Sequence, residues 1–128
     1  MAAKTRFRGS FTALVTPFKN GGAVDEKAFR DLVEWQITEG TNGLVPVGTT
    51  GESPTLSHKE HEQVVEWCVD QAKGRVPVIA HVSDAGTTIA VERAKHAEKA
   101  GAAAIVSHPP YFWHPKASMV VEHLAQVG

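Results

Sequence analysis

The sequence predicts an α/β fold in which parallel strands alternate with helices. Short apolar runs alternate with amphipathic stretches four times along the 128 residues, which is typical of successive βα units joined by crossover connections. Gly40, Gly74 and Gly101 each follow a predicted helix, as expected where helices end in a left-handed residue. A closed eight-stranded barrel needs roughly 250 residues. Four units therefore predict a partial (β/α)8 TIM barrel, about half of the whole.

Each unit has its own boundary signals. The predicted strands are 10–15, 43–47, 76–82 and 103–107, and the predicted helices are 25–39, 57–73, 87–100 and a last helix that begins near Lys116. Asp25 is the expected N-cap of the first helix. Ser57 and Glu60 have the Ser-x-x-Glu spacing of a capping box before the second helix.

We expect one partial-barrel domain over residues 1–128, truncated before the later strands of the barrel. The reason is that a chain ending on the fourth helix leaves an open sheet edge with unpaired backbone groups. A compact open sheet of four strands is the structural alternative.

Composition excludes several classes of function. The chain is 42% hydrophobic and 21% charged, with a net charge of -1, which offers no basic field for nucleic acid. No stretch approaches the roughly 20 apolar residues of a membrane span, and the N-terminus lacks the apolar centre of a secretory signal. We therefore expect a cytoplasmic protein without nucleic-acid or membrane partners. Cys68 falls within an apolar helical pattern and is interpreted as a buried hydrophobe.

The turn Gly48-Thr49-Thr50-Gly51 directly follows the second predicted strand. Ligands of parallel α/β barrels bind at the carboxyl ends of the strands, and small residues there let an anion approach the backbone. Thr49 and Thr50 are therefore candidates for binding a carboxylate. A polar turn that only leads into the next helix is the plainer interpretation of the motif.

Several blocks in the same order identify a family resemblance. They are Gly9-Ser10, Ala13-Leu14-Val15-Thr16-Pro17-Phe18, the stretch from Gly43 to Leu56, and Gly74-Arg75-Val76-Pro77-Val78-Ile79-Ala80. The chain resembles the N-terminal half of the dihydrodipicolinate synthase and N-acetylneuraminate lyase family of pyruvate-dependent class I aldolases.

The resemblance implies a reaction, the residues that take part in it and the partners of the chain. The family forms a Schiff base between a lysine and pyruvate, and the synthase branch then condenses it with aspartate semialdehyde on the path to lysine. Thr49 and Thr50 would bind the carboxylate of pyruvate or another 2-oxo acid, and Thr49 would also act catalytically by passing protons. The resemblance further implies a homo-oligomer, a dimer or tetramer, and we expect neither a metal nor another cofactor.

The Schiff-base lysine of the family lies on the sixth strand, beyond the four units of this chain. A nucleophilic lysine should be desolvated at the end of an apolar strand so that its pKa falls. The chain's lysines all fall in predicted loops or on helix surfaces: Lys4, Lys19, Lys27, Lys59, Lys73, Lys95, Lys99 and Lys116. We therefore expect this polypeptide alone to be inactive.

The chain departs from the synthase pattern beyond Ala80. Phe112 replaces the tyrosine that relays protons across a dimer interface in the synthase branch, and a phenyl ring has no hydroxyl to do so. His81-Val82 is closer to the neuraminate lyase branch, and Pro109-Pro110-Tyr111 is similar to the sugar-acid dehydratase branch. Both branches stay open as alternatives.

The synthase branch also has a lysine-feedback pocket at a dimer interface. The residues that match it, and that are therefore interface or allosteric candidates, are Ser53, His58, His61 and Tyr111. Ala85 and Ile89 replace an amide and a carboxylate of that pocket, which predicts weak feedback by lysine because the ammonium loses its charged partner.

Two rival hypotheses come from other classes of protein. His81 and His108 fall at the ends of the third and fourth predicted strands, where imidazoles could bind the metal of a barrel hydrolase. Alternatively, the chain is a noncatalytic half-barrel that self-associates, with Tyr111-Phe112-Trp113 as an interface patch.

Overall fold

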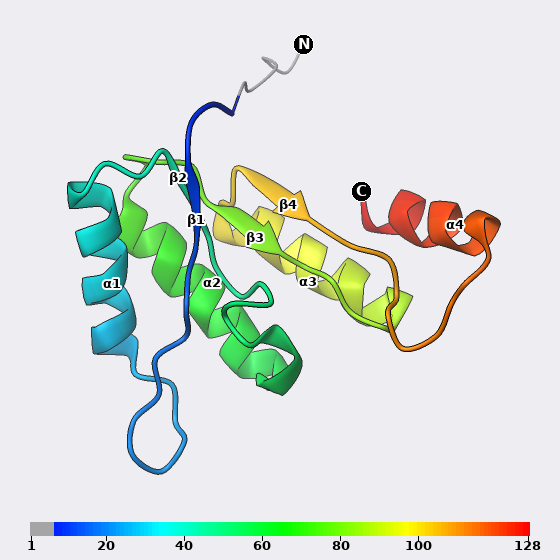
Figure 1. Cartoon of the computed structure of the whole chain (residues 1–128), viewed down its shortest axis with the longest axis horizontal. Coiled ribbons are helices and arrows are strands. Elements are labelled where there is room, and N and C mark those ends of the chain that lie inside the picture. Colours follow the sequence, from blue (N-terminus) through cyan, green and yellow to red (C-terminus); the bar gives the residue numbers. More distant parts are fainter. Residues whose placement is uncertain (1–6) are drawn as a thin grey trace.

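The computed structural model describes residues 7–128, along which a strand is followed by a helix four times (Figure 1). The strands are β1 (Phe11–Ala13), β2 (Gly43–Val45), β3 (Ile79–His81) and β4 (Ala104–Val106). The helices are α1 (Glu26–Thr38), α2 (His58–Ala72), α3 (Thr87–Ala100) and α4 (Ala117–Val127), and a short 3₁₀ helix, η1 (Ser53–Thr55), precedes α2. The prediction of an α/β chain of four βα units is confirmed. Lys4 and the start of the predicted domain lie outside the described residues.

The strands run parallel and follow one another in chain order. Thr12 of β1 lies opposite Leu44 of β2, and Ala80 of β3 lies opposite Ile105 of β4. A parallel bridge between Leu44 and Val78 joins the two pairs. The spatial order is therefore β1-β2-β3-β4, the order expected when each βα unit adds the next strand.

Each strand spans three residues and is shorter than predicted. Pro46 has no N–H to donate, and Val47 has a φ of 52°, so the ladder cannot continue beyond Val45. Pro77 likewise provides only its carbonyl, which accepts from the N–H of Leu44 over 3.0 Å. The sheet is consequently narrow, and the chain turns directly beyond it.

The helix boundaries follow the predicted caps. The carboxylate of Asp25 accepts from the N–H of Ala28 over 3.1 Å. Ser57 and Glu60 form the predicted capping box, because each side chain accepts from the backbone N–H of the other. At the C-terminus of α2, however, the cap is Lys73 with a φ of 50°, one residue before the predicted Gly74.

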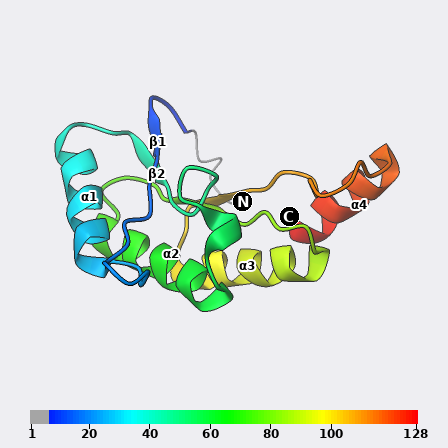
Figure 2. The ribbon, with the colours of Figure 1, turned by 60° about the horizontal axis from the view of Figure 1, so that its bottom comes forward.

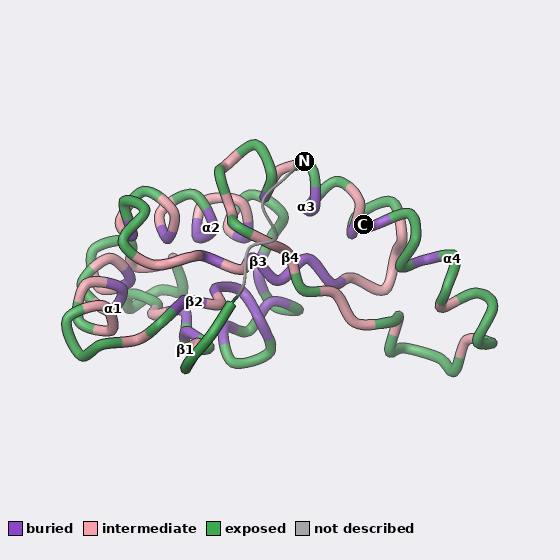
Figure 3. The backbone as a smooth tube through the Cα atoms, turned by 90° about the horizontal axis from the view of Figure 1, so that it is seen from above, coloured by how far each residue is buried: buried purple, intermediate pink, exposed green. Residues whose placement is uncertain are grey.

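Helices α1, α2 and α3 form a layer against one face of the strands, and α4 packs beside α3 at the far end (Figure 2). The core lies between the strands and this layer, and Figure 3 shows the buried stretches of backbone there. Its fully buried members include Leu14, Phe29, Val33, Leu44, Val47, Val64 and Cys68. None of the helices in residues 7–128 has the length and apolarity needed to cross a membrane.

The burial of its side chains predicts how much stability is lost when a residue on the buried or on the exposed face of α1 is replaced by alanine. Phe29 is fully buried, whereas Trp35 on the same helix is 56% exposed. Phe29→Ala should lower the free energy of unfolding by about 3–5 kcal/mol, because it removes buried contacts and leaves a cavity. Trp35→Ala is the matched control and should cost less than about 1 kcal/mol. Urea denaturation followed by circular dichroism measures both; equal losses would contradict the described orientation of α1.

Candidate functional site

The turn after β2, residues 46–53, has an unusual backbone held by several contacts. Val47 lies in the left-handed region, which a β-branched residue rarely adopts, although its side chain is fully buried. The hydroxyl of Thr16 donates to the carbonyl oxygen of Gly51 over 2.7 Å in a buried hydrogen bond. A Cβ at Gly51 would lie 3.0 Å from the carbonyl oxygen of Leu14, so a side chain there requires the neighbouring backbone to shift. The turn is thus packed against the segment that follows β1.

This turn presents the two predicted carboxylate-binding residues. Thr49 and Thr50 are both exposed, and the carbonyl of Thr49 accepts from the N–H of Glu52 over 3.0 Å. Thr49 borders a small depression beyond the carboxyl ends of β2, β3 and β4, which we call the rim hollow. Its lining residues are Thr49, Ser53, Pro54, His81, Ser83, Asp84, Arg93, His108 and Tyr111. Thr50 is not among them, so its predicted role has no contact in the rim hollow to support it.

Three aromatic side chains form a row along the rim hollow. The ring centroids of His81 and His108 are 5.1 Å apart, and those of His108 and Tyr111 are 5.5 Å apart. Burial lowers the pKa of His81, and the neighbouring His108 and Arg93 lower it further. His81 therefore presents a neutral imidazole to the rim hollow at neutral pH.

His61 lies on α2 and is almost fully buried, with 1% of its surface exposed. Its Nε2 lies 3.0 Å from the carbonyl oxygen of His81. Burial, followed by the charge of Arg93, lowers the pKa of His61 to about 4. This histidine connects α2 to the end of β3, and its neutral form is part of the folded structure.

Arg93 is a residue that we did not predict from the sequence. It lies on α3 and is only 7% exposed. Its Nη1 donates to the carbonyl oxygen of Ser83 over 2.7 Å and lies 3.2 Å from a carboxylate oxygen of Asp84. One signal was present, because Arg93 is next to Ala94 and within one turn of Ala90 and Ala97 on the buried face of α3. A charged residue on an apolar helix face often marks a polar partner below it.

Of the four predicted interface or allosteric residues, two line the rim hollow and two do not. Ser53 and Tyr111 line the rim hollow. His61 lies below it through its contact with His81, and His58 lies on the exposed side of α2, with Nε2 3.1 Å from Glu62. Two of the four therefore face one hollow, and their role in feedback or assembly stays a prediction.

No described lysine has the environment of an imine-forming residue. All seven lysines within residues 7–128 are exposed. The hydrogen bond to Asp31 raises the pKa of Lys27, opposite to the shift that an amine nucleophile needs. Cys68 is buried, as predicted, and burial raises the pKa of its thiol to about 12.

The metal hypothesis gains no support from the described residues. His81 and His108 do lie side by side, but residues 7–128 contain no group of three His, Cys, Asp or Glu side chains placed to hold an ion. A catalytic zinc site usually has three protein ligands.

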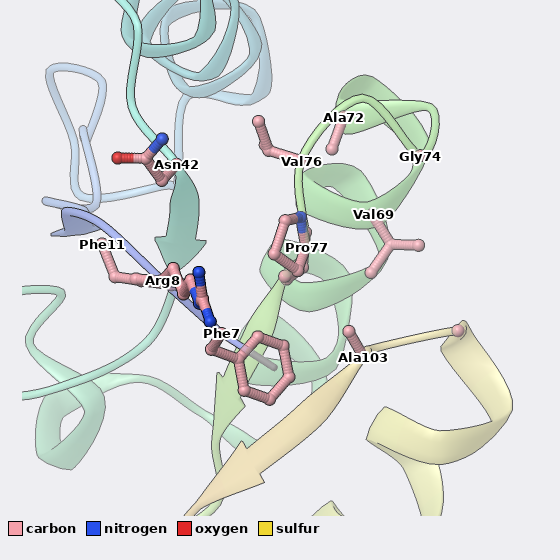
Figure 4. Close-up of a pocket in the computed structure, with 12 residues that line it drawn as sticks. Phe7, Arg8, Phe11, Asn42, Val69, Ala72, Gly74, Val76, Pro77 and Ala103 are labelled. Atoms are coloured by element: carbon pink, nitrogen blue, oxygen red, sulfur yellow. The ribbon is translucent and has the colours of Figure 1, made fainter. Parts of the chain in front are cut away.

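A larger cavity, of about 530 Å³, lies at the opposite ends of the strands (Figure 4). Phe7, Phe11, Val76 and Pro77 surround it with apolar surface, and Arg8 and Asn42 are at its side. Catalytic groups of barrel enzymes gather at the carboxyl ends of the strands, not at these amino ends. We therefore place the candidate site at the rim hollow despite its smaller size.

The lowered pKa values of His61 and His81 predict that the fold is sensitive to acid. Because folding lowers the pKa of His61 from 6.5 to about 4, the unfolded chain binds more protons between these values, and stability falls as the pH falls through this window. The shift corresponds to at most about 3–4 kcal/mol at about 1.4 kcal/mol for each pKa unit, and His81 adds to it in the same direction. Urea unfolding at a series of pH values tests this, with His61→Gln expected to flatten the pH dependence and His58→Gln to leave it unchanged. A stability that is constant from pH 7 to pH 4 contradicts the prediction.

The model of the Dihydrodipicolinate synthetase family matches residues 6–127. The 4-hydroxy-tetrahydrodipicolinate synthases of Bradyrhizobium diazoefficiens and Rhodopseudomonas palustris are 64% and 65% identical over 128 residues, which is 100% of this chain and 43% of each relative. The chain therefore spans less than half the length of these relatives.

Solved structures agree with the sequence comparisons. A dihydrodipicolinate synthase from Acinetobacter baumannii, in complex with pyruvate, has a TM-score of 0.92 at 40% identity and covers 95% of this chain and 42% of its own. YagE from Escherichia coli, also in complex with pyruvate, has a TM-score of 0.92 at 27% identity and covers 97% of this chain and 42% of its own. The predicted partial barrel is confirmed, with a TM-score of 0.91 to a further dihydrodipicolinate synthase at 43% identity. This chain belongs to the dihydrodipicolinate synthetase family.

Proposed function

We propose that this chain is the part of a pyruvate-dependent Schiff-base lyase that binds the carboxylate of a 2-oxo acid. The observation that carries the proposal is the fixed turn after β2, which presents Thr49 at the carboxyl ends of the strands. Hydroxyl and backbone N–H groups stabilise an anion there without themselves titrating. Thr49 and Thr50 would bind the carboxylate, and the Thr49 hydroxyl would pass protons. Pyruvate is the first candidate substrate, because two structurally similar proteins are complexes with it.

The name shared by the curated relatives favours a 4-hydroxy-tetrahydrodipicolinate synthase. In this assignment the pyruvate imine condenses with aspartate semialdehyde in lysine biosynthesis. Phe112, which is 84% exposed and has no hydroxyl, argues against the proton relay of that branch. The second candidates are therefore a neuraminate lyase-like enzyme and a sugar-acid dehydratase of the same family.

Assembly and location are further parts of the proposal. Tyr111, Phe112 and Trp113 are 59%, 84% and 48% exposed, and such a run is typical of a surface covered by another protein chain. We propose a homo-oligomer that covers it. A cytoplasmic location, which we expect from the sequence, is also part of the proposal.

The exposure of the described lysines leads to a prediction of inactivity. The 128-residue chain should form no imine, because its exposed amines stay protonated at neutral pH. Borohydride reduction with labelled pyruvate, followed by peptide mass spectrometry, should therefore detect no modified lysine. The intact Bradyrhizobium diazoefficiens relative is the positive control. Stable labelling of any lysine in this chain would overturn the prediction.

Removal of the Thr49 hydroxyl tests the proposed carboxylate contact. A hydrogen bond to a charged group is worth roughly 1.5–3 kcal/mol, so Thr49→Val should weaken pyruvate binding about 10-fold or more. The matched control is Thr38→Val, whose hydroxyl bonds only to the carbonyl of Glu34 on α1. Chemical-shift titration of the labelled chain with pyruvate measures both variants. Equal affinity for wild type and Thr49→Val would exclude Thr49 from the carboxylate site.

A further inference from the structure

The cavity at the amino ends of the strands has no role in the proposed function, yet it has the features of a ligand site. We call it the amino-end cavity, and its apolar lining includes Phe7, Phe11, Val69, Val76, Pro77 and Val78 (Figure 4). Its volume is about 530 Å³, and pockets for small molecules typically measure roughly 300–1,000 Å³ and are mostly apolar with a few polar groups. The cavity is therefore large enough for a whole small molecule.

Two aromatic rings form one wall of the amino-end cavity. The ring centroids of Phe7 and Phe11 are 5.8 Å apart, with the ring planes at 90°. Gly43 on the neighbouring strand leaves room for the Phe11 ring, because a Cβ at that position would overlap it. Phe7 is 38% exposed, so a bound molecule can reach its ring. Aromatic rings favour edge-to-face and offset contacts with one another, and this wall therefore suits a ligand with an aromatic ring.

The polar groups of the amino-end cavity are hydrogen-bond donors. Arg8 is the one charged side chain among the described lining residues, and it has no ion-pair partner within residues 7–128. The Oδ1 of Asn42 accepts from the N–H of Ser10 over 2.8 Å, which leaves the amide NH2 group free to donate. A guanidinium and an amide N–H together favour an anionic group. None of the described residues that line the cavity carries a carboxylate that would repel it.

The helix ends beside the amino-end cavity offer little repulsion to an anion. Ala72 and Gly101 line the cavity at the carboxyl ends of α2 and α3, where free carbonyl groups favour cations. The Ala72 carbonyl, however, accepts from the backbone N–H and from Nε of Arg75 over 3.0 and 3.2 Å. The Ala97 carbonyl accepts from the N–H of Ala102 over 3.0 Å. These carbonyl groups are already engaged, so they oppose an anion only weakly.

We propose that the amino-end cavity binds a small aromatic acid, whose ring lies against Phe7 and Phe11 and whose anionic group is bound by Arg8 and Asn42. This site goes beyond the proposed function, because it lies at the opposite ends of the strands from Thr49 and shares no residue with the rim hollow. A ligand with only one of the two features binds less tightly, since an acid without a ring leaves the apolar wall in water and a ring without a charge leaves the guanidinium unpaired.

The probe is 2-naphthoate, because it combines fused aromatic rings with one carboxylate. The full chain, labelled at the valine methyl groups, is titrated with it at constant ionic strength. We expect saturable shifts of the methyl signals of Val69, Val76 and Val78, which line the cavity, and no shift of Val121, which is 67% exposed on α4. Acetate should cause no saturable shift of these signals. The neutral 2-naphthalenemethanol should bind about 3- to 5-fold more weakly, because water screens an exposed ion pair and limits its contribution.

Two substitutions test the two parts of the site. Arg8→Gln should weaken 2-naphthoate binding about 3- to 5-fold, whereas Lys59→Gln, which removes an exposed charge at the other end of α2, should not change it. Ala103→Trp places a large side chain in the cavity and should weaken binding at least about 10-fold, because it displaces the ring of the probe from the apolar wall. Ala117→Trp makes the same change at an exposed position of α4 and is its control. Amide spectra verify that every variant is folded.

Each of four results would overturn the proposal. They are the absence of saturable valine shifts, equal binding of 2-naphthoate and 2-naphthalenemethanol, equal binding by Arg8→Gln and wild type, and unchanged binding by folded Ala103→Trp. Sedimentation with and without the probe tests the alternative that a second copy of the chain fills the cavity. A dimer that dissociates on Ala103→Trp substitution or on addition of the probe would show a second copy there instead, whereas an unchanged molecular mass agrees with the proposal.

Discussion

The buried hydrogen bond from the Thr16 hydroxyl to the Gly51 carbonyl is the contact on which the candidate site depends. It joins residues 35 positions apart, the segment after β1 and the turn after β2. The turn needs such support because Val47 occupies a left-handed conformation that costs on the order of 1–3 kcal/mol. Full burial of the Val47 side chain helps to offset that cost. The turn thereby presents an exposed Thr49 beyond the carboxyl end of β2.

Parallel strand order explains why the polar groups meet. β2, β3 and β4 end at the same edge, and each is followed by a polar residue that reaches the rim hollow: Thr49, Ser83 and His108. The connecting helices then close the site from below. Arg93 of α3 bonds to the carbonyl of Ser83, and His61 of α2 contacts the carbonyl of His81. The hollow thus arises from the topology, whereas its chemistry depends on a few polar residues of β3 and α3 and of the loops that follow the strands.

The features that were predictable from the sequence are those determined by neighbouring residues. The caps at Asp25 and Ser57 depend on contacts within four residues, and both were placed correctly. Strand ends were predicted too long because the end of β2 depends on the conformation of Val47, which is supported by residues elsewhere in the chain. Arg93 was missed for the same reason. Its burial depends on the carbonyl of Ser83 and on the carboxylate of Asp84, which only the folded chain brings within reach.

Under the proposed function, binding the carboxylate and forming the imine require different electrostatic environments. The rim hollow is lined by hydroxyls, by the neutral imidazole of His81 and by the guanidinium of Arg93, all of which stabilise anions without reacting with a carbonyl. Imine formation needs the opposite environment, an amine whose pKa is lowered by burial or by a neighbouring cation. Every described lysine is exposed, and the carboxylate of Asp31 raises the pKa of Lys27. The two requirements thus belong to different environments, and the described residues provide only the one that suits an anion.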